Sequence, residues 1–224
     1  MSAEPPPGLK TRGEAPTGTR LVLVRHGEAV CNARGLIGGP AGCGGLTELG
    51  RAQARELAAR LARTRELDDV GALYTSTLPR SIETAALLAG SLPALAPVAD
   101  CGLCELHPGE ADGLGWEEYV ARYGAPDWGT DPTTPMSPGG ESWTGFYERA
   151  TAAMAALVER HRGQRVLLVV HGGVIEQAMK VVLGAAPSAR LRLLTEHCSM
   201  TEVEFAGAAP RLLRYNDLAP LSAA

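Results

Sequence analysis

Four segments of the chain have the length and spacing of β-strands. Residues 21–24 and 166–170 are continuous apolar runs, and residues 71–76 also have the pattern of a buried strand. Such runs are typical of strands that are buried on both faces, as in a parallel sheet. Residues 201–205 instead alternate between larger apolar or β-branched side chains and acidic ones. This alternation predicts a late strand, which we place at an edge of the sheet.

Between these strands, apolar residues recur at spacings of three and four, which is typical of amphipathic helices. Thr47 is placed as the N-cap of the first helix, because a threonine side chain can accept a hydrogen bond from the first helical turn. Helices that alternate with strands favour parallel βαβ units with right-handed crossovers. The expected helices include residues 54–61, 82–89, 116–123, 146–157 and 175–182.

The remaining segments lack periodicity. Residues 1–19 have the composition of a flexible leader and residues 219–224 that of a C-terminal tail, so we expect one domain over residues 20–218. Glycine and proline are the strongest signals of turns and loops. Loops are expected at residues 35–45, 92–115 and 127–140.

Charge and composition argue against several kinds of function. A net charge of −4 at pH 7 disfavours a general nucleic-acid binder. No apolar run reaches the length of a membrane span and the N-terminus lacks a signal-peptide core, so we expect no membrane partner and a cytoplasmic location. Five cysteines in no regular framework do not suggest a secreted disulfide scaffold. The apolar C-terminal stretches are compatible with a homodimer.

One pair of cysteines has the spacing of a metal or redox motif. Cys101 and Cys104 form a Cys-x-x-Cys segment. A zinc site built this way normally needs a second such pair, and a redox motif normally opens a helix after a strand. Neither context is visible in the sequence, so we predict no metal ion and no redox role for this segment.

Histidine and arginine side chains follow the predicted strands. Arg25 and His26 come directly after the first apolar run, Arg80 comes shortly after the second, and His171 follows the third. Carboxyl ends of parallel strands lie along one edge of a sheet, so the two histidines meet in one pocket if their strands are neighbours. Arginine matches phosphate oxygens, and nearby cations lower the pKa of a histidine and keep it neutral as a nucleophile. The cluster favours a phosphoryl site, with a metal site or two unrelated histidines as alternatives.

Six motifs occur in a fixed order along the chain. They are Arg25-His26-Gly27-Glu28 with Asn32, Leu-Thr-x-x-Gly at 46–50, Ser-x-Leu-x-Arg-x-x-Glu-Thr-Ala at 76–85, Glu105 with the glycines after it, Gly140-Glu141-Ser142, and Val170-His171-Gly172-Gly173. Together they resemble the histidine phosphatase superfamily, also called the phosphoglycerate-mutase-like family, over most of residues 20–205. The resemblance implies an α/β fold, a three-layer α/β/α sandwich around a mostly parallel central sheet.

The resemblance also implies roles for the polar groups. His26 would attack phosphorus and become phosphohistidine, while Glu105 would protonate the leaving alkoxide and then accept a proton from water. The arginines and the second histidine would hold the phosphoryl oxygens. The implied enzyme is a metal-independent phosphomonoester hydrolase without a cofactor that acts on a small phosphorylated metabolite. Its catalytic set is His26, Glu105, His171, Arg25 and Arg80, and its substrate-binding set is Arg25, Asn32, Arg80, His171 and Gly172.

Other polar residues have simpler interpretations. Glu141 either touches the site or faces solvent, and His107 is favoured as a surface residue over a substrate contact. His161 lies at the expected end of a helix and is assigned no function. Structural roles are favoured for Glu28, Gln53, Glu83 and Thr84.

The chain departs from the family pattern around the pocket. Ile37 and Gly38 stand where the family often has a glutamine that reaches the phosphate. Substrate identity is therefore not carried over from the resemblance. The other departures are at Cys43, Gly44, Pro108, Ala111, Asp112 and His197.

Two alternatives to hydrolysis stay open. A phosphoglycerate mutase primed by 2,3-bisphosphoglycerate usually has a longer insertion and extra basic residues after Glu105. Between Glu105 and Gly140 this chain has one arginine, Arg122, and no lysine, which favours hydrolysis. A non-catalytic phosphate-binding module is disfavoured because both histidines, both arginines and the glutamate are present.

Overall fold

The computed structural model of the chain describes residues 18–191, 193–207 and 209–218. Its strands are β1 (Thr19–Arg25), β2 (Val70–Thr75), β3 (Val98–Ala99), β4 (Arg165–Val170), β5 (Met200–Ala206) and β6 (Ala209–Asp217). They form a six-stranded sheet in the order β3-β2-β4-β1-β5-β6. The strands from β3 to β1 are parallel, whereas β5 and β6 are added antiparallel. The mostly parallel sheet is confirmed.

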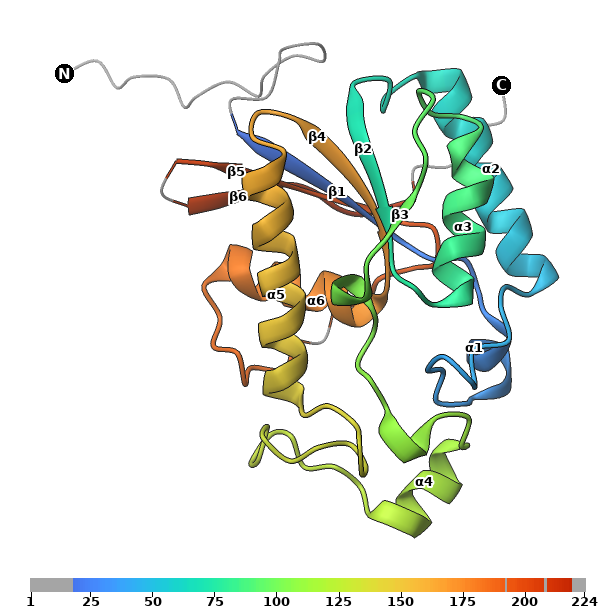
Figure 1. Cartoon of the computed structure of the whole chain (residues 1–224), viewed down its shortest axis with the longest axis vertical. Helices are drawn as coiled ribbons and strands as arrows, with labels where there is room; N and C mark the ends of the chain where they lie inside the picture. Colours follow the sequence, from blue (N-terminus) through green and yellow to red (C-terminus); the bar gives the residue numbers. More distant parts are fainter. Residues whose placement is uncertain (1–17, 192, 208, 219–224) are drawn as a thin grey trace.

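The helices lie in the connections between these strands (Figure 1). They are α1 (Val30–Arg34), α2 (Glu48–Thr64), α3 (Pro79–Ala89), α4 (Trp116–Tyr123), α5 (Trp143–Arg160) and α6 (Gly172–Leu183), with the 3-10 turns η1 (Cys101–Leu103) and η2 (Gly109–Ala111). The five expected helices are confirmed, and α2 begins as predicted because the Thr47 side chain accepts a hydrogen bond from the backbone of Gly50 at 2.9 Å.

Alternate residues of β1 enter two hydrophobic cores on opposite faces of the sheet. Leu21 and Leu23 pack in one core with the apolar residues of α5 and α6. Val22 and Val24 pack in the other with those of α2 and α3. Figure 1 shows the two pairs of helices on either side of the sheet. The expected three-layer α/β/α sandwich is therefore confirmed.

The late strand does not form an edge of the sheet, so that prediction is wrong. β5 pairs with β1 on one side and with β6 on the other, and β6 is the edge. The acidic residues Glu202 and Glu204 are almost fully buried, although their alternation suggested a face toward solvent. Glu202 accepts hydrogen bonds from Arg165 and Arg214, so the ion pairs satisfy its charge inside the fold.

A second charged cluster ties α2 to β6. Arg60 Nε donates to Glu66 Oε1, Arg60 Nη2 to Asp217 Oδ2, and Arg214 Nη1 to Glu66 Oε2, each at 2.8 Å. Burial alone would raise the pKa of Glu66, but the hydrogen bonds from the two arginines lower it to about 2. The carboxylate is therefore charged over the whole physiological pH range and holds the edge strand to the helix.

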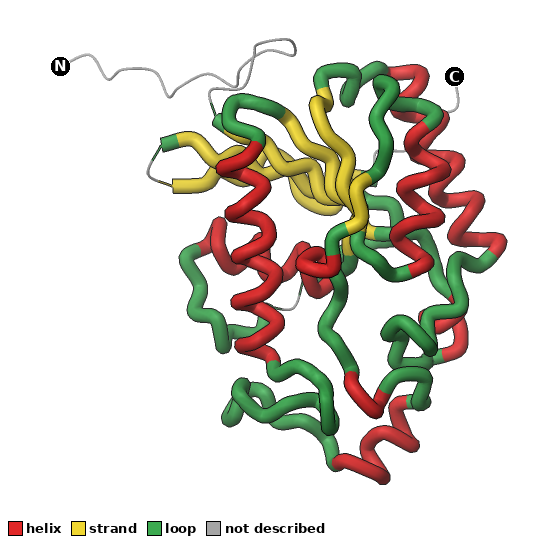
Figure 2. Tube along the Cα trace, in the orientation of Figure 1, coloured by secondary structure: helices red, strands yellow, loops and turns green. Residues whose placement is uncertain are grey.

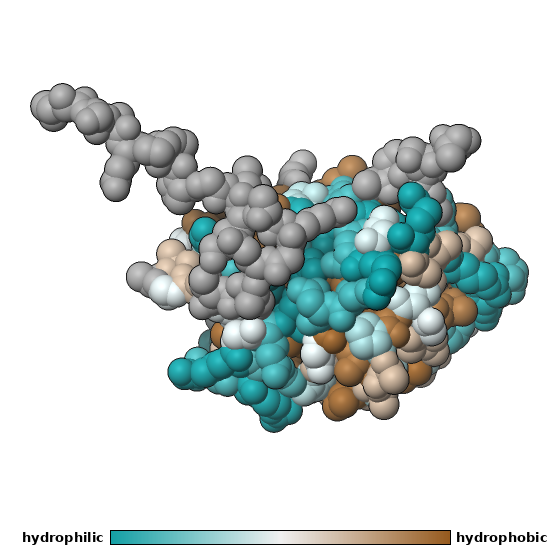
Figure 3. All heavy atoms as spheres, turned by 90° about the horizontal axis from the view of Figure 1, so that it is seen from above, coloured by the Kyte–Doolittle hydropathy of each residue, from teal (hydrophilic) through white to brown (hydrophobic). Residues whose placement is uncertain are grey.

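The two ends of the described chain lie away from the long loops (Figure 1). Thr19, the last residue of the predicted leader, is instead the buried first residue of β1, and its hydroxyl donates to the carbonyl of Val158 at 2.9 Å. Residues 1–17 of that leader and the predicted tail at 219–224 lie outside the described residues. Within the described residues, no helix combines the length and hydropathy of a membrane span. From above, hydrophobic residues are interspersed among hydrophilic ones (Figure 3).

The segment between β3 and α5 is mostly loop and extends beyond the carboxyl ends of the parallel strands (Figure 2). It contains the two 3-10 turns and α4, and the expected loop at 127–140 has no helix or strand. Open α/β sheets bind their ligands outside the carboxyl ends of the strands. The long loops therefore cover the edge at which a site is expected.

Candidate active site

The two histidines of the predicted cluster meet at the carboxyl ends of neighbouring strands. β1 and β4 pair in parallel, with Arg25 opposite Val170, so His26 and His171 follow at adjacent positions. Their ring centroids are 5.0 Å apart and the ring planes are inclined by 60°. Both side chains are buried. The prediction that the two imidazoles share one site is confirmed.

The contacts of His26 define which of its nitrogens can react. Nδ1 lies 2.7 Å from the carbonyl oxygen of Gly27. A carbonyl only accepts hydrogen bonds, so Nδ1 carries the proton and Nε2 keeps a free lone pair. Burial, reinforced by the positive charge of Arg80, holds the pKa of His26 well below its ordinary value of 6.5. His26 is therefore a neutral imidazole whose Nε2 is available for attack on an electrophile.

Arg80, at the start of α3, lies at the centre of the cluster. Its Nε donates to His26 Nε2 at 3.1 Å and to His171 Nδ1 at 3.3 Å. Its Nη1 donates to the carbonyl of Gly38 at 2.8 Å and to Cys43 Sγ at 3.3 Å. The guanidinium occupies the space that a metal ion bridging the two histidines would need, and its charge repels a cation there. The arrangement favours an anion over the two-histidine metal alternative.

His171 is held by two serines behind this arginine. Its Nε2 lies 2.7 Å from Ser76 Oγ and 3.3 Å from Ser81 Oγ. Because Arg80 donates to Nδ1, the proton of the neutral ring is on Nε2 and points to Ser76. Burial and the charge of Arg80 hold the pKa of His171 well below 6.5. His171 is thus fixed as a neutral ring against Arg80.

Arg25 has a donor that nothing in the described part of the chain satisfies. One of its terminal nitrogens, Nη1, donates to the carbonyl of Thr195. Its Nε is buried and has no hydrogen-bond partner among the described residues. Burial lowers the pKa of Arg25 below its ordinary value, but the group stays charged near neutral pH. A buried, charged donor without a partner is what an anionic oxygen would satisfy.

Glu105 approaches the same site from the loop after η1. Its Oε2 accepts a hydrogen bond at 3.0 Å from the backbone of Gly173, in the first turn of α6. Arg149 of α5 holds the loop in place, because it donates to the carbonyls of Glu105, Cys104, Gly102 and Cys101. The carboxyl group is therefore positioned by two helices, although it is carried by a loop.

A pocket of about 530 Å³ opens over these groups. Six of the predicted site residues line it, and His171 is the exception, because it is fully buried and contacts the others through Arg80 and the ring of His26. Asn32 is exposed at the rim, where its Oδ1 accepts a hydrogen bond from the backbone of Ala29 at 3.1 Å. The lining members of the predicted set are Arg25, His26, Asn32, Arg80, Glu105 and Gly172.

Comparison with known proteins agrees with this geometry. A sequence profile of the histidine phosphatase superfamily (branch 1) matches residues 21–218. The chain belongs to the histidine phosphatase superfamily.

Relatives of this histidine phosphatase carry both phosphatase and mutase names. The chain is 35% identical over 173 residues to phosphoglycerate mutase-like protein 4 of Arabidopsis thaliana, covering 76% of this chain and 72% of the relative. It is 33% identical over 179 residues to the metal-independent phosphoserine phosphatase of the same plant, covering 77% and 72%. A mycobacterial glucosyl-3-phosphoglycerate phosphatase, solved with VO3, superposes with a TM-score of 0.71 at 28% identity, covering 88% of this chain and 98% of that one.

The four polar residues for which structural roles were favoured make hydrogen bonds near His26 in this histidine phosphatase. Thr47 Oγ1 donates to Glu28 Oε1 at 2.7 Å, and the Glu28 backbone donates to Gln53 Oε1 at 2.9 Å. Glu83 accepts a hydrogen bond from Arg51. In the same way, Thr84 Oγ1 accepts a hydrogen bond from the backbone of Gly27 at 3.1 Å. These contacts fix the turn that follows β1.

Two other sequence interpretations need revision. Glu141 neither touches the pocket nor faces solvent freely, because it is half-buried and paired with Arg149 at 2.6 Å. His161, to which no function was assigned, has its Nε2 3.0 Å from the hydroxyl of Tyr74. His107, favoured as a surface residue, is partly buried beside Glu141 and does not line the pocket.

Several groups that support the site were not found by sequence reasoning. Ser76 orients His171, while Cys43 and the carbonyl of Gly38 hold Arg80. Cys43 and Gly38 come from the glycine-rich loop, whose path no periodicity predicts. Ser76 did carry a signal, because it directly follows β2 at the same sheet edge as the two histidines.

Proposed function

We propose that this histidine phosphatase is a metal-independent phosphomonoester hydrolase that acts through a phosphohistidine on His26. The observation that carries the proposal is a neutral imidazole whose unprotonated Nε2 accepts a hydrogen bond from the buried Arg80, beside Arg25, whose buried Nε has no partner among the described residues. The imidazole supplies the nucleophile, and the two arginines supply positive charge for a phosphoryl group. Phosphoryl transfer needs mainly such positioning and charge stabilisation.

In the first step, His26 Nε2 attacks phosphorus. The N–P bond forms, the P–O bond to the alcohol breaks, and the carboxyl group of Glu105 gives its proton to the departing oxygen. Arg25 and Arg80 hold the non-bridging oxygens, for which Arg80 exchanges its hydrogen bond with His26 for one with the phosphoryl group. Asn32 and the backbone at the start of α6, including Gly172, add neutral donors.

In the second step, water takes the place of the alcohol. The Glu105 carboxylate accepts a proton from the water, an O–P bond forms, and the N–P bond breaks to regenerate the neutral histidine. His171 keeps Arg80 and the ring of His26 in position through both steps. Every proton is carried by Glu105, and no step uses a metal ion.

The walls of the pocket bear on the alcohol part of the substrate. Arginines 25 and 80 are its lining cations within the described residues, whereas Glu176 adds an acidic group. A substrate with a second phosphate therefore finds no further cation there. Trp143 Nε1 is buried without a hydrogen-bond partner among the described residues. We propose a single phosphate on a small alcohol with an apolar or aromatic part; the apolar walls are Ile37, Leu106, Trp116, Trp128, Met136, Trp143, Leu193 and Leu194.

The mechanism is tested by trapping the intermediate. The full chain is mixed with ³²P-labelled phenyl phosphate and quenched in alkali, which preserves phosphohistidine, and free phosphate is measured in parallel. We expect label on the wild type and on the matched control His161→Ala, and neither label nor turnover with His26→Ala. Turnover that persists in His26→Ala at more than about a thousandth of the wild-type rate would refute the mechanism.

The same reaction distinguishes hydrolysis from mutase chemistry. With 2,3-bisphosphoglycerate as donor, a mutase returns the label to monophosphoglycerate, whereas a phosphatase releases it as free phosphate. We expect free phosphate. A substrate panel then tests the pocket: naphthyl phosphate should exceed phosphoserine in kcat/KM by about tenfold, as for one well-buried aromatic ring. The reverse order would contradict the substrate class and leave the hydrolytic mechanism standing.

A further inference from the structure

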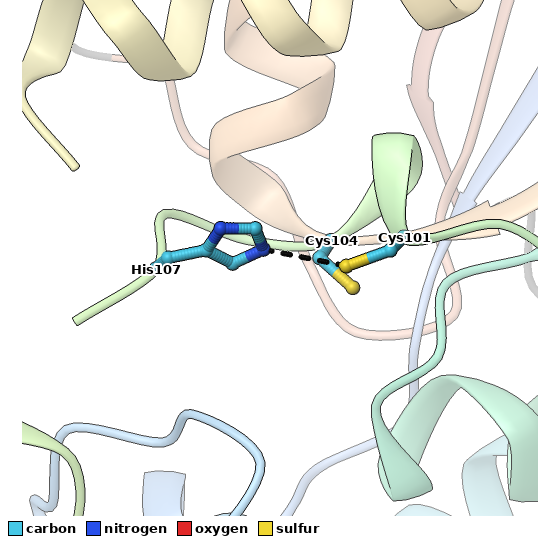
Figure 4. Close-up of side chains that lie close together, drawn as sticks. All are labelled: Cys101, Cys104 and His107. Carbon is cyan, nitrogen blue, oxygen red and sulfur yellow. Dashed lines mark hydrogen bonds between the residues drawn. The ribbon is translucent and has the colours of Figure 1, made fainter. Parts of the chain in front are cut away.

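The loop that carries Glu105 brings together three side chains that the proposed reaction does not use. Cys101, Cys104 and His107 each offer one ligand atom, and these atoms all lie within 4.8 Å of one another. Cys101 Sγ is 3.5 Å from His107 Nε2. Figure 4 shows this nitrogen directed at the sulfur, with the second sulfur beside it. None of the three residues lines the phosphate pocket.

We propose that Cys101, Cys104 and His107 form a binding site for Zn²⁺. Thiolate and imidazole are the ligands that this ion prefers. In a tetrahedral site, zinc–sulfur and zinc–nitrogen bonds of about 2.3 and 2.0 Å place sulfur and nitrogen roughly 3.5 Å apart. The distance of 3.5 Å between Cys101 Sγ and His107 Nε2 already matches this separation. Since Cys101 is exposed, water supplies the fourth ligand and the ion exchanges with solvent.

The backbone holds the two cysteines in a shape suited to a common ligand. Cys104 donates from its backbone nitrogen to the carbonyl of Cys101 at 3.0 Å and closes the 3-10 turn. Arg149 donates to the carbonyls of both cysteines, at 3.2 and 3.0 Å. This contact fixes the turn from outside. The turn is therefore arranged before any ion arrives.

A carboxylate orients the histidine from its other side. Glu141 Oε1 lies 3.5 Å from His107 Nδ1, and Glu141 Oε2 accepts a hydrogen bond from the backbone of His107 at 2.9 Å. Histidines that bind metal ions typically direct their second nitrogen to a carboxylate, which leaves the other nitrogen free for the metal. Glu141 gives His107 this orientation, with Nε2 toward the sulfurs.

The sequence did not predict a metal site at the Cys-x-x-Cys segment, because the third ligand is of a different kind from the one expected. A second cysteine pair was expected, but the third ligand is a histidine three residues after Cys104, brought round by the loop. Because Glu105 lies between Cys104 and His107, an ion bound here restrains the residues on both sides of the general acid. The inference does not depend on the proposed reaction, since its readout is binding.

The test is metal binding by the full chain under reducing conditions. After metal is removed with a chelator, Zn²⁺ is titrated against a chromophoric competitor, and Co²⁺ is added separately as a spectroscopic probe. We expect one Zn²⁺ per chain, and a Co²⁺ spectrum with thiolate charge-transfer bands and the intense visible bands of a tetrahedral site. Cys101→Ser and His107→Gln should each weaken Zn²⁺ binding by at least about tenfold.

Cys198→Ser is the matched control, because it removes a cysteine outside the cluster, and it should bind Zn²⁺ as the wild type does. Circular dichroism of each variant verifies the fold. Zn²⁺ binding that is unchanged in both Cys101→Ser and His107→Gln would overturn the proposal. So would an octahedral Co²⁺ spectrum without thiolate bands, or a Cys101–Cys104 disulfide that persists under the reductant.

Discussion

Gly173→Ala tests the role of Glu105 without altering a titratable group. A Cβ at residue 173 would lie under 3.0 Å from Glu105 Oε1 and 2.9 Å from Phe146 Cε1. Phe146 is fully buried in the core, whereas the carboxyl group is the free end of a flexible side chain. The carboxylate must therefore retreat by about 1 Å to regain ordinary contact. The substitution therefore displaces the carboxylate and also presses on the buried ring of Phe146, so the melting temperature is needed to separate the two effects.

A displacement of about 1 Å in a catalytic geometry costs roughly 100-fold in rate, or about 2.7 kcal/mol of activation free energy. The loss falls on substrates whose alkoxide must be protonated. We expect kcat/KM for an alkyl phosphate to fall about 100-fold, and that for p-nitrophenyl phosphate, whose leaving group needs no proton, to change by less than about threefold. Phosphate release from both substrates and the melting temperature are measured for each variant.

Two further variants frame this result. Glu105→Gln removes the proton donor and sets the limit of the effect on the alkyl substrate. Gly90→Ala is the matched control, because a Cβ there meets nothing within 4 Å, and it should behave as the wild type on both substrates. Equal losses of Gly173→Ala on both substrates, with an unchanged melting temperature, would refute the reasoning, because they would place the defect in phosphoryl transfer rather than in protonation. An absence of loss would refute it as well.

Three other predictions follow from buried charges and donors. Burial and Arg80 hold the pKa of His26 and of His171 below 6.5, so the unfolded chain binds protons first as the pH falls. The free energy of unfolding, measured by urea titration, should therefore decrease below pH 6.5 by up to about 2.7 kcal/mol per pH unit. A flat profile would contradict neutral buried rings. Glu66→Gln should lower that free energy by roughly 1–3 kcal/mol at pH 7. Because the pKa of Glu66 is about 2 in the fold and ordinarily 4.5, this difference should be complete above pH 4.5 and vanish toward pH 2; a constant difference would show that the charge is not its source. Cys43→Ala removes one acceptor of Arg80 and should raise KM for p-nitrophenyl phosphate about two- to tenfold with little change in kcat, whereas unchanged kinetics would show that the thiol does not position the arginine.

The central sheet and the paired histidines could be predicted because their signals are local. Strands buried on both faces are continuous apolar runs, and β1 and β4 each end directly at a histidine. The two histidines then lie side by side if the two strands are parallel and adjacent. The edge of the sheet could not be predicted in this way. β6 has no clean alternation and its pairing with β5 shifts register twice.

The burial of Glu202 and Glu204 depends on contacts over long distances in the sequence. Arg165 is 37 residues from Glu202, and Arg20 is 184 residues from Glu204. An acidic residue in an alternating pattern indicates a solvent-facing side unless its partner is known. The same limit applies to the site, where the supports of Arg80 and Glu105 come from the glycine-rich loop and from α5. Gly173 is the second of the two glycines that directly follow His171 in the sequence. The structure shows the reason for a glycine there, because a side chain would collide with Glu105.

The hydrogen bonds from Arg149 to the loop around Glu105 affect which side chains of the pocket can be replaced. The guanidinium binds four backbone carbonyls of that loop. Because these contacts are made to backbone atoms, they do not depend on which side chains the loop carries. We expect that Pro108 and Leu106, which line the pocket from this loop, can be exchanged while Glu105 keeps its position at the pocket. Substrate preference and catalytic geometry are thus mechanically separable here, and the loop is the place to alter one without the other.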